Sequence, residues 1–237
     1  METGQKESGG HTLKAFDEDM DELRALISEM GGLAEEAIRE SMRCLMQRDY
    51  DGARAVVEAD ARLDVLEAQA EAAVVRLIAL RAPMADDLRE AVAALKISGL
   101  VERIGDYAKN NAKRVQLFAD SGRIEPISLL PEMARIAAEM VHNALDAFIA
   151  RDAEKAHEVC VRDKALDDFY NSIFRALLTF MMESPKNITE SAHLLFVAKN
   201  LERIGDHATN IAEMVYYAAT GDRLTERPRG HNPADPE

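Results

Sequence analysis

The chain has 237 residues and is strongly acidic, with 29 Lys and Arg against 43 Asp and Glu and a formal net charge of −14. This charge, the lack of Trp and an aromatic content of 5% argue against a nucleic-acid binder and against electrostatic docking on anionic lipid. A hydrophobic content of 47% suits a folded chain with a sizeable core and is too high for global disorder.

The compartment is predicted from three features of the sequence. Residues 1–11 are polar and lack the apolar segment of a secretion signal. The most apolar stretch, Ala72 to Leu80, is interrupted by Arg76 and is far too short to span a membrane. Cys44 and Cys160 fit buried, reduced thiols better than a disulfide framework. We therefore expect a soluble, cytoplasmic protein.

Helices are predicted along nearly the whole chain, because long segments without proline are rich in Ala, Leu, Glu, Arg and Met. Apolar residues recur at steps of three and four from Val56 to Leu80 and again from Val197 to Val215, which is the spacing of a helix with one buried face. Residues 1–12 and 221–237 are predicted to be disordered. The predicted helices are 13–47, 51–82, 86–119, 128–150, 152–183 and 187–219.

Parts of the first half recur about one hundred residues later. Arg48-Asp49 recurs as Arg151-Asp152, Asp60-x-x-Leu63-Asp64 as Asp163-x-x-Leu166-Asp167, and Leu100 to Asp106 as Asn200 to Asp206. The predicted fold is therefore all-α, with two tandem repeats of an antiparallel three-helix bundle at residues 13–122 and 123–220.

Four carboxylates of each repeat are predicted to meet at one level of its bundle. The second and third helices are antiparallel because their connection is short, so residues equally far from the turn lie at equal height. Asp64 and Glu102 each lie 19 residues from Pro83, which places them about 28 Å from the turn. The two predicted sets are Asp60, Asp64, Glu102 and Asp106 in the first repeat, and Asp163, Asp167, Glu202 and Asp206 in the second.

These carboxylates point to a metal site. Like charges one helical turn apart repel each other by about 1 to 4 kcal/mol at the flank of a protein, and a divalent cation would relieve that repulsion. Carboxylate ligands suit Mg, Mn, Ca or iron and also admit Zn, and they can bridge several ions. The alternative is an ordinary charged helix face, with Arg103 or Arg203 paired to the acids.

Other residues near this level are weaker candidates. Gly105 and Gly205 each precede the last Asp, and a glycine inside a helix costs ~1 kcal/mol relative to Ala. Such a glycine indicates a close approach by a neighbouring backbone or a bound group, or simply tight helix packing. The additional candidate ligands are Glu36, Glu139, Asn110 and Asn210.

A carboxylate-bridged metalloenzyme is the alternative from another class. Four-helix di-iron proteins use two Glu-x-x-His motifs at one level, and the chain contains Glu154-x-x-His157 and Glu190-x-x-His193. The antiparallel arrangement separates the two histidines by ~28 Å, so they do not share a metal. The sequence also lacks a recognisable catalytic triad and a phosphate-binding Gly loop. We therefore expect no enzyme activity.

The segments Leu100 to Ala108 and Asn200 to Asn210 resemble the paired acidic motif of the PhoU family of bacterial phosphate-uptake regulators. In that family, Glu or Asp is followed four residues later by Asp, once in each of two three-helix bundles. The resemblance covers residues 13–220, including the order of helices, the turns and the repeat. It places the family motif on Glu102 and Asp106, and again on Glu202 and Asp206.

The resemblance implies a homodimeric, cytoplasmic negative regulator of phosphate uptake and phosphate-starvation signalling. It implies two partners, a phosphate ABC transporter contacted through its ATPase subunit and a membrane sensor histidine kinase, which would hold the protein at the inner membrane. Some family members bind multinuclear metal clusters at the motif. Because Tyr107 and Lys109 replace His207 and Thr209 of the second copy, the two sites are expected to differ in affinity or in metal. A metal-independent helical adaptor is the second alternative.

Overall fold

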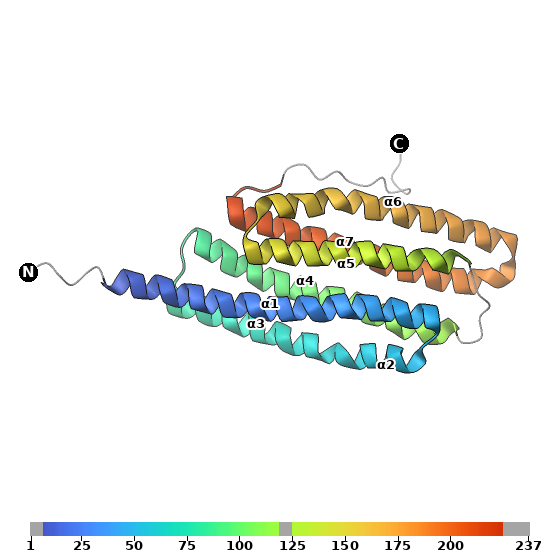
Figure 1. Ribbon diagram of the computed structural model, residues 1–237, viewed down its shortest axis with the longest axis horizontal. Coiled ribbons are helices and arrows are strands. Elements are labelled where there is room, and N and C mark those ends of the chain that lie inside the picture. Colours follow the sequence, from blue (N-terminus) through green and yellow to red (C-terminus); the bar gives the residue numbers. More distant parts are fainter. Residues whose placement is uncertain (1–6, 119–124, 225–237) are drawn as a thin grey trace, which may run out of the picture.

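The computed structural model describes residues 7–118 and 125–224, in which long helices lie side by side in an elongated assembly (Figure 1). The first bundle contains α1 (Glu7–Gln47), α2 (Tyr50–Ala59), α3 (Ala61–Arg81) and α4 (Asp86–Arg114), and the second contains α5 (Leu130–Ala150), α6 (Ala153–Glu183) and α7 (Ile188–Thr220). Short 3₁₀ helices lie at η1 (Val115–Phe118), η2 (Glu125–Leu129) and η3 (Pro185–Asn187). The described part of the chain contains no strand, and the predicted all-α fold of two tandem three-helix units is confirmed.

The repeated Arg-Asp pair forms the turn between the first and second helices of each unit. Arg48 and Arg151 adopt left-handed backbone conformations, with φ of 55° and 54°, which end the preceding helix. The side chains of Asp49 and Asp152 then accept hydrogen bonds from backbone N–H groups of the next helix at 2.9 to 3.0 Å. The same sequence signal therefore closes one helix and begins the next in both units.

Three predicted helix boundaries differ from the structure. The helix predicted at 51–82 is divided at Asp60, where the N–H of Leu63 donates to the Asp60 carbonyl at 2.9 Å and closes a tighter turn. Helix α4 ends at Arg114 instead of 119, because a 3₁₀ turn follows it. Helix α1 begins at Glu7 instead of 13, in a polar segment without apolar periodicity. Residues 1–6 and 225–237 of the predicted disordered ends lie outside the described residues.

The predicted apolar faces form much of the core. In α7, the six residues Val197, Leu201, Ile204, Ala208, Ile211 and Val215 are all buried. In the first unit Leu63, Leu66 and Leu77 are buried, whereas Leu80 is 66% exposed because α3 ends one residue later. Cys44 and Cys160 are both buried, as predicted. None of the helices within the described residues combines the length and apolar character that a membrane crossing requires.

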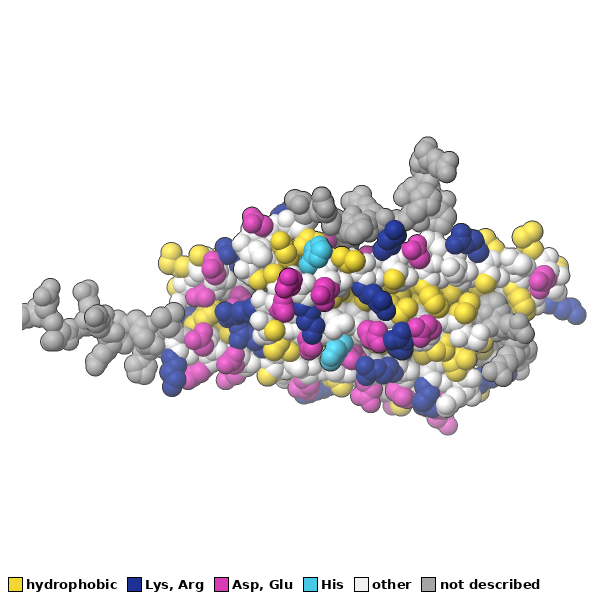
Figure 2. All heavy atoms as spheres, turned by 45° about the horizontal axis from the view of Figure 1, so that its top comes forward, with side chains coloured by type: hydrophobic (Ala, Val, Ile, Leu, Met, Phe, Trp, Pro, Cys, Tyr) yellow, Lys and Arg dark blue, Asp and Glu magenta, His cyan; other side chains and the backbone are white. Residues whose placement is uncertain are grey.

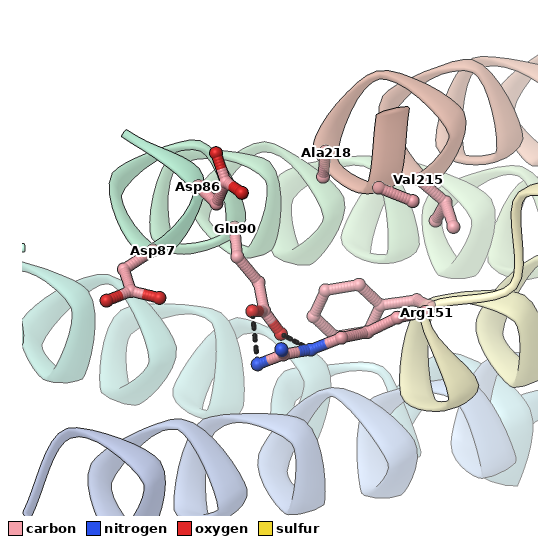
Figure 3. Close-up of a pocket in the computed structure, with 8 residues that line it drawn as sticks. Asp86, Asp87, Glu90, Arg151, Val215 and Ala218 are labelled. Atoms are coloured by element: carbon pink, nitrogen blue, oxygen red, sulfur yellow. Dashed lines mark hydrogen bonds and ion pairs between the residues drawn. The ribbon is translucent and has the colours of Figure 1, made fainter. Parts of the chain in front are cut away.

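The two bundles meet where α4 packs against α7 and α1 packs against α5. A buried carboxylate forms ion pairs across this interface. Glu90 of α4 is 6% exposed and contacts Arg151, from the turn after α5. The Arg151 atoms Nε and Nη2 lie 2.9 Å and 2.5 Å from the carboxylate oxygens. Arg24 of α1 contacts the same carboxylate. Figure 3 shows Arg151 reaching Glu90 beside a cavity of about 160 Å³. One acid therefore joins three segments from both bundles.

Candidate carboxylate site

Helix packing at Gly105 brings the acidic residues of the first bundle together. A Cβ atom at this position of α4 would overlap Cδ1 of Leu63, so the glycine admits the leucine of α3. Asp60 lies one turn before Leu63, and its Oδ1 lies 3.5 Å from the same Cβ position. Of the sequence-based explanations for this glycine, the structure therefore shows close helix packing. The second bundle repeats the contact with Gly205, Leu166 and Asp163.

The first carboxylate group contains five acids from the second and third helices of its bundle. Partial burial raises the pKa of Glu102 to about 7, with further contributions from the negative charges of the four other acids. The structure thus brings together all four acids that the sequence places at this level and adds a fifth. The members of the group are Asp60, Asp64, Glu67, Glu102 and Asp106.

The second carboxylate group contains the four repeat-related acids, Asp163, Asp167, Glu202 and Asp206. Burial raises the pKa of Asp167 to about 6, assisted by the charges of Asp163 and Asp206. Burial also raises the pKa of Glu202, against the opposing effect of a nearby lysine. Both groups therefore hold negative charges that disfavour one another.

One lysine approaches each group, but at different ends. In the first group, Nζ of Lys109 lies 2.5 Å from both Asp60 Oδ2 and Asp106 Oδ1. In the second group, Nζ of Lys199 lies 2.6 Å from Glu202 Oε1. Each ammonium stabilises part of its group, so the remaining negative charge has a different position in the two bundles.

A stacked pair of rings lies where α4 packs against α7, one residue after the last Asp of each group. The rings of Tyr107 and His207 lie 5.5 Å apart with an angle of 18° between them, and the Arg203 guanidinium lies 5.7 Å from the Tyr107 ring centre. Burial lowers the pKa of His207 against the opposing charge of Asp206, and the charges of Arg103 and Arg203 add to the lowering. Neither arginine forms an ion pair with the described residues, whose motif acids pair with Lys109 and Lys199 instead, so this part of the alternative, a charged helix face paired with these arginines, is absent there.

The four weaker candidates have separate surroundings. Glu36 lines a cavity of about 340 Å³ together with Asp60 and Gly105, next to the first group. Glu139 instead pairs with Arg135, one turn earlier on α5, and lines a different cavity between α1 and α5. Glu139 therefore does not stand to the second carboxylate group as Glu36 stands to the first. Asn110 is exposed and Asn210 is half-buried.

The donor atoms suit a hard divalent cation, although the ligands are not arranged around a common point. Acidic and basic side chains are interspersed on the face shown in Figure 2, whereas each carboxylate group has four or five acids to one lysine. This excess of carboxylate oxygens fits Mg, Mn, Ca or iron. Within the described residues, however, no three His, Cys, Asp or Glu side chains converge to hold an ion. A cation would therefore require side-chain rotation in either group.

The sequence prediction omits Glu67 and Lys199, although the rule of equal distance from the turn applies to both. Glu67 and Gly99 each lie 16 residues from Pro83, and Glu67 Oε1 lies 3.2 Å from the Cβ position of Gly99. Lys199 lies opposite Tyr170 by the same rule, and its Nζ is 5.4 Å from that ring.

The raised pKa of Glu102 predicts a pH-dependent effect of the variant Glu102→Gln in metal-free protein. The folded pKa of about 7 lies above the ordinary value of 4.5, so between these values the folded chain holds a proton that the unfolded chain has released. The contribution of Glu102 to stability therefore falls as pH rises. Because the group is partly solvated, we expect Glu102→Gln to gain about 1 kcal/mol relative to wild type between pH 5 and 7.5. Urea unfolding with chelator measures this gain, and a constant difference between the proteins would contradict it.

Known proteins resemble this chain over nearly its whole length. A family model described as "PhoU domain" matches residues 27–115 and 130–215. The phosphate-specific transport system accessory protein PhoU homolog of Zymomonas mobilis is 54% identical over 221 residues, which are 93% of each chain. The protein of the same description from Rhizobium meliloti is 46% identical over 96% of this chain and 95% of its own.

Solved structures agree with the sequence comparisons. The crystal structure of PhoU from Pseudomonas aeruginosa superposes with a TM-score of 0.83 at 35% identity, covering 87% of this chain and all of that chain. The phosphate transport system regulatory protein PhoU from Streptococcus pneumoniae gives a TM-score of 0.82 at 25% identity, covering 89% of this chain and all of its own.

Proposed function

The chain belongs to the PhoU family, and from this premise we propose that it is an accessory protein of phosphate-specific transport that restrains phosphate uptake and phosphate-starvation signalling. The names of the Zymomonas and Rhizobium relatives, both accessory proteins of a phosphate-specific transport system, support the transport role. The description of the Streptococcus protein as regulatory supports control rather than catalysis.

In the proposed mechanism the protein is a cytoplasmic, homodimeric adaptor between the ATPase subunit of a phosphate ABC transporter and a sensor histidine kinase. When metal is bound, the bundles keep one shape that is able to bind partners. In this shape the protein is divided between the transporter and the kinase according to transport status. A bound cation would supply the positive charge that each carboxylate group lacks, and iron, zinc, manganese and magnesium are candidates. The carboxylates of each group would hold the cations bound there. Each group would thereby fix the second and third helices of its bundle relative to one another.

The doubling of the carboxylate group is the observation that carries the metal part of the proposal. Each bundle packs a leucine onto a mid-helix glycine and thereby holds acids of two helices together. This arrangement raises the pKa of Glu102 and of Asp167, which is a cost that folding alone does not require. The metal-independent adaptor is the second candidate, and it is favoured by the lysine that already balances part of each group.

A deletion strain tests the proposal. We expect loss of the gene to raise a phosphate-regulated reporter in phosphate-rich medium, and wild-type protein to restore repression. The variant Asp106→Asn/Asp206→Asn should keep the helical fold and lose both repression and bound metal, measured by elemental analysis of protein purified without chelator or affinity metal. Asp51→Asn/Asp86→Asn, which changes two exposed acids outside the groups, is the matched control.

The outcomes of this experiment separate the alternatives. An unchanged reporter in the deletion strain would contradict the regulatory role. Repression by a double variant that has lost its metal would favour the metal-independent adaptor. If wild-type protein contains no metal, the carboxylate groups are an ordinary charged helix surface. If metal persists in the double variant, the ligands of that metal lie elsewhere.

A further inference from the structure

We infer that Lys109 is a tethered cation that competes with metal for the first carboxylate group and weakens the binding of divalent cations there. The inference rests on the proposed metal binding of this group. It concerns a residue outside the acidic motif, at a position where the two repeats differ.

The position of Lys109 is that of a counterion rather than of an ordinary surface lysine. Its Nζ is 2.5 Å from Asp106 Oδ1, one turn away on α4, and 2.5 Å from Asp60 Oδ2, at the junction of α2 and α3. The Asp60 side chain is only 8% exposed and that of Lys109 only 21%. The ammonium therefore lies between carboxylates of two helices that would otherwise be available to a divalent cation.

The second bundle has a different side chain at the equivalent position. Thr209 is fully buried, and its hydroxyl donates to the Gly205 carbonyl at 3.1 Å, within its own helix. The lysine of this bundle, Lys199, approaches from the opposite end and contacts Glu202. The side chain at the position equivalent to Lys109 is therefore uncharged in the second bundle, and it bonds within its own helix.

Electrostatics gives the direction of the effect. A metal entering the first group must displace the ammonium from Asp60 and Asp106, or bind beside it and meet its repulsion. Removing the charge of Lys109 should therefore strengthen metal binding in the first bundle only.

A manganese titration in a single-group background tests this inference. Asp206→Asn leaves only the first group intact, and the free Mn²⁺ signal in electron paramagnetic resonance measures its dissociation constant. In this background we expect Lys109→Thr, which copies the second bundle, and Lys109→Met, which keeps the length of the side chain, each to tighten binding roughly tenfold or more. Lys113→Thr, which removes the same charge from an exposed site one turn later on α4, should leave the constant unchanged.

A second measurement is independent of metal affinity. Without metal, Lys109→Met should lower the urea midpoint, because Asp60 and Asp106 lose their counterion, and added Mn²⁺ should restore it. Equal Mn²⁺ affinity with and without Lys109, or equal tightening by Lys113→Thr, would overturn the inference while leaving metal binding intact. Mn²⁺ binding that appears in the Asp206→Asn background only when Lys109→Thr is added would support it, whereas absence of binding from every variant would overturn this inference together with the metal proposal.

Discussion

Replacing Glu90 by glutamine is expected to lower the free energy of unfolding by about 2 kcal/mol, because it removes the buried carboxylate that two arginines share across the interface. Glu90 is 6% exposed and contacts Arg24 and Arg151. The side chain of Arg24 is only 15% exposed, but it also contacts Asp21 at 2.6 Å. The side chain of Arg151 is 51% exposed, so water and Asp21 together replace part of the lost carboxylate.

This effect should extend to both bundles, since Glu90 belongs to the first and Arg151 to the second. Urea unfolding followed by circular dichroism measures it, and Asp87→Asn, one turn earlier on α4 and beside the same cavity, is the control. We expect the control to cost less than about 1 kcal/mol, the range of a charge near a helix N-terminus. A Glu90 variant no less stable than this control would show that the contacts across the interface contribute little to stability.

Much of the fold follows from local signals that the structure realises directly. The Arg-Asp repeat predicts a turn in each unit, and both copies close one helix and cap the next. The apolar spacing of α7 predicts a buried face, and the residues of that face are all buried in the structure. The interruption at Asp60 escapes prediction because it depends on one tightened backbone hydrogen bond, which does not alter the apolar pattern around it.

The site is predictable to the level of its helices but not to its individual contacts. Equal distance from the turn brings Asp64 and Glu102 into one group because it depends only on helix rise and chain direction. The contacts of Lys109 and Glu139 depend on which rotamer reaches which acid, and the sequence holds no signal for this choice. The same applies to Glu90, whose importance becomes visible only when segments of both bundles are placed together.

Adding a methyl group at Gly105 and Gly205 should destabilise the fold, by about 2 to 5 kcal/mol in the double variant Gly105→Ala/Gly205→Ala. Each new Cβ would overlap a leucine, Leu63 or Leu166, that is almost fully buried. This cost outweighs the ~1 kcal/mol that alanine normally gains over glycine in a helix. A cavity beside Leu63 can accept part of its displacement, so Gly205→Ala should be the more costly single change.

The matched control is Gly32→Ala in α1, where a Cβ atom would meet nothing within 4 Å, so we expect a small gain in stability from helix propensity alone. Leu63→Ala combined with Gly105→Ala should cost less than the two single changes together, because the smaller side chain makes room for the methyl group. Urea unfolding measures all these variants. If Gly105→Ala and Gly205→Ala instead stabilise the protein as Gly32→Ala does, helix packing does not explain the two glycines. Their place beside Asp106 and Asp206 would then have to reflect the close approach of a bound group.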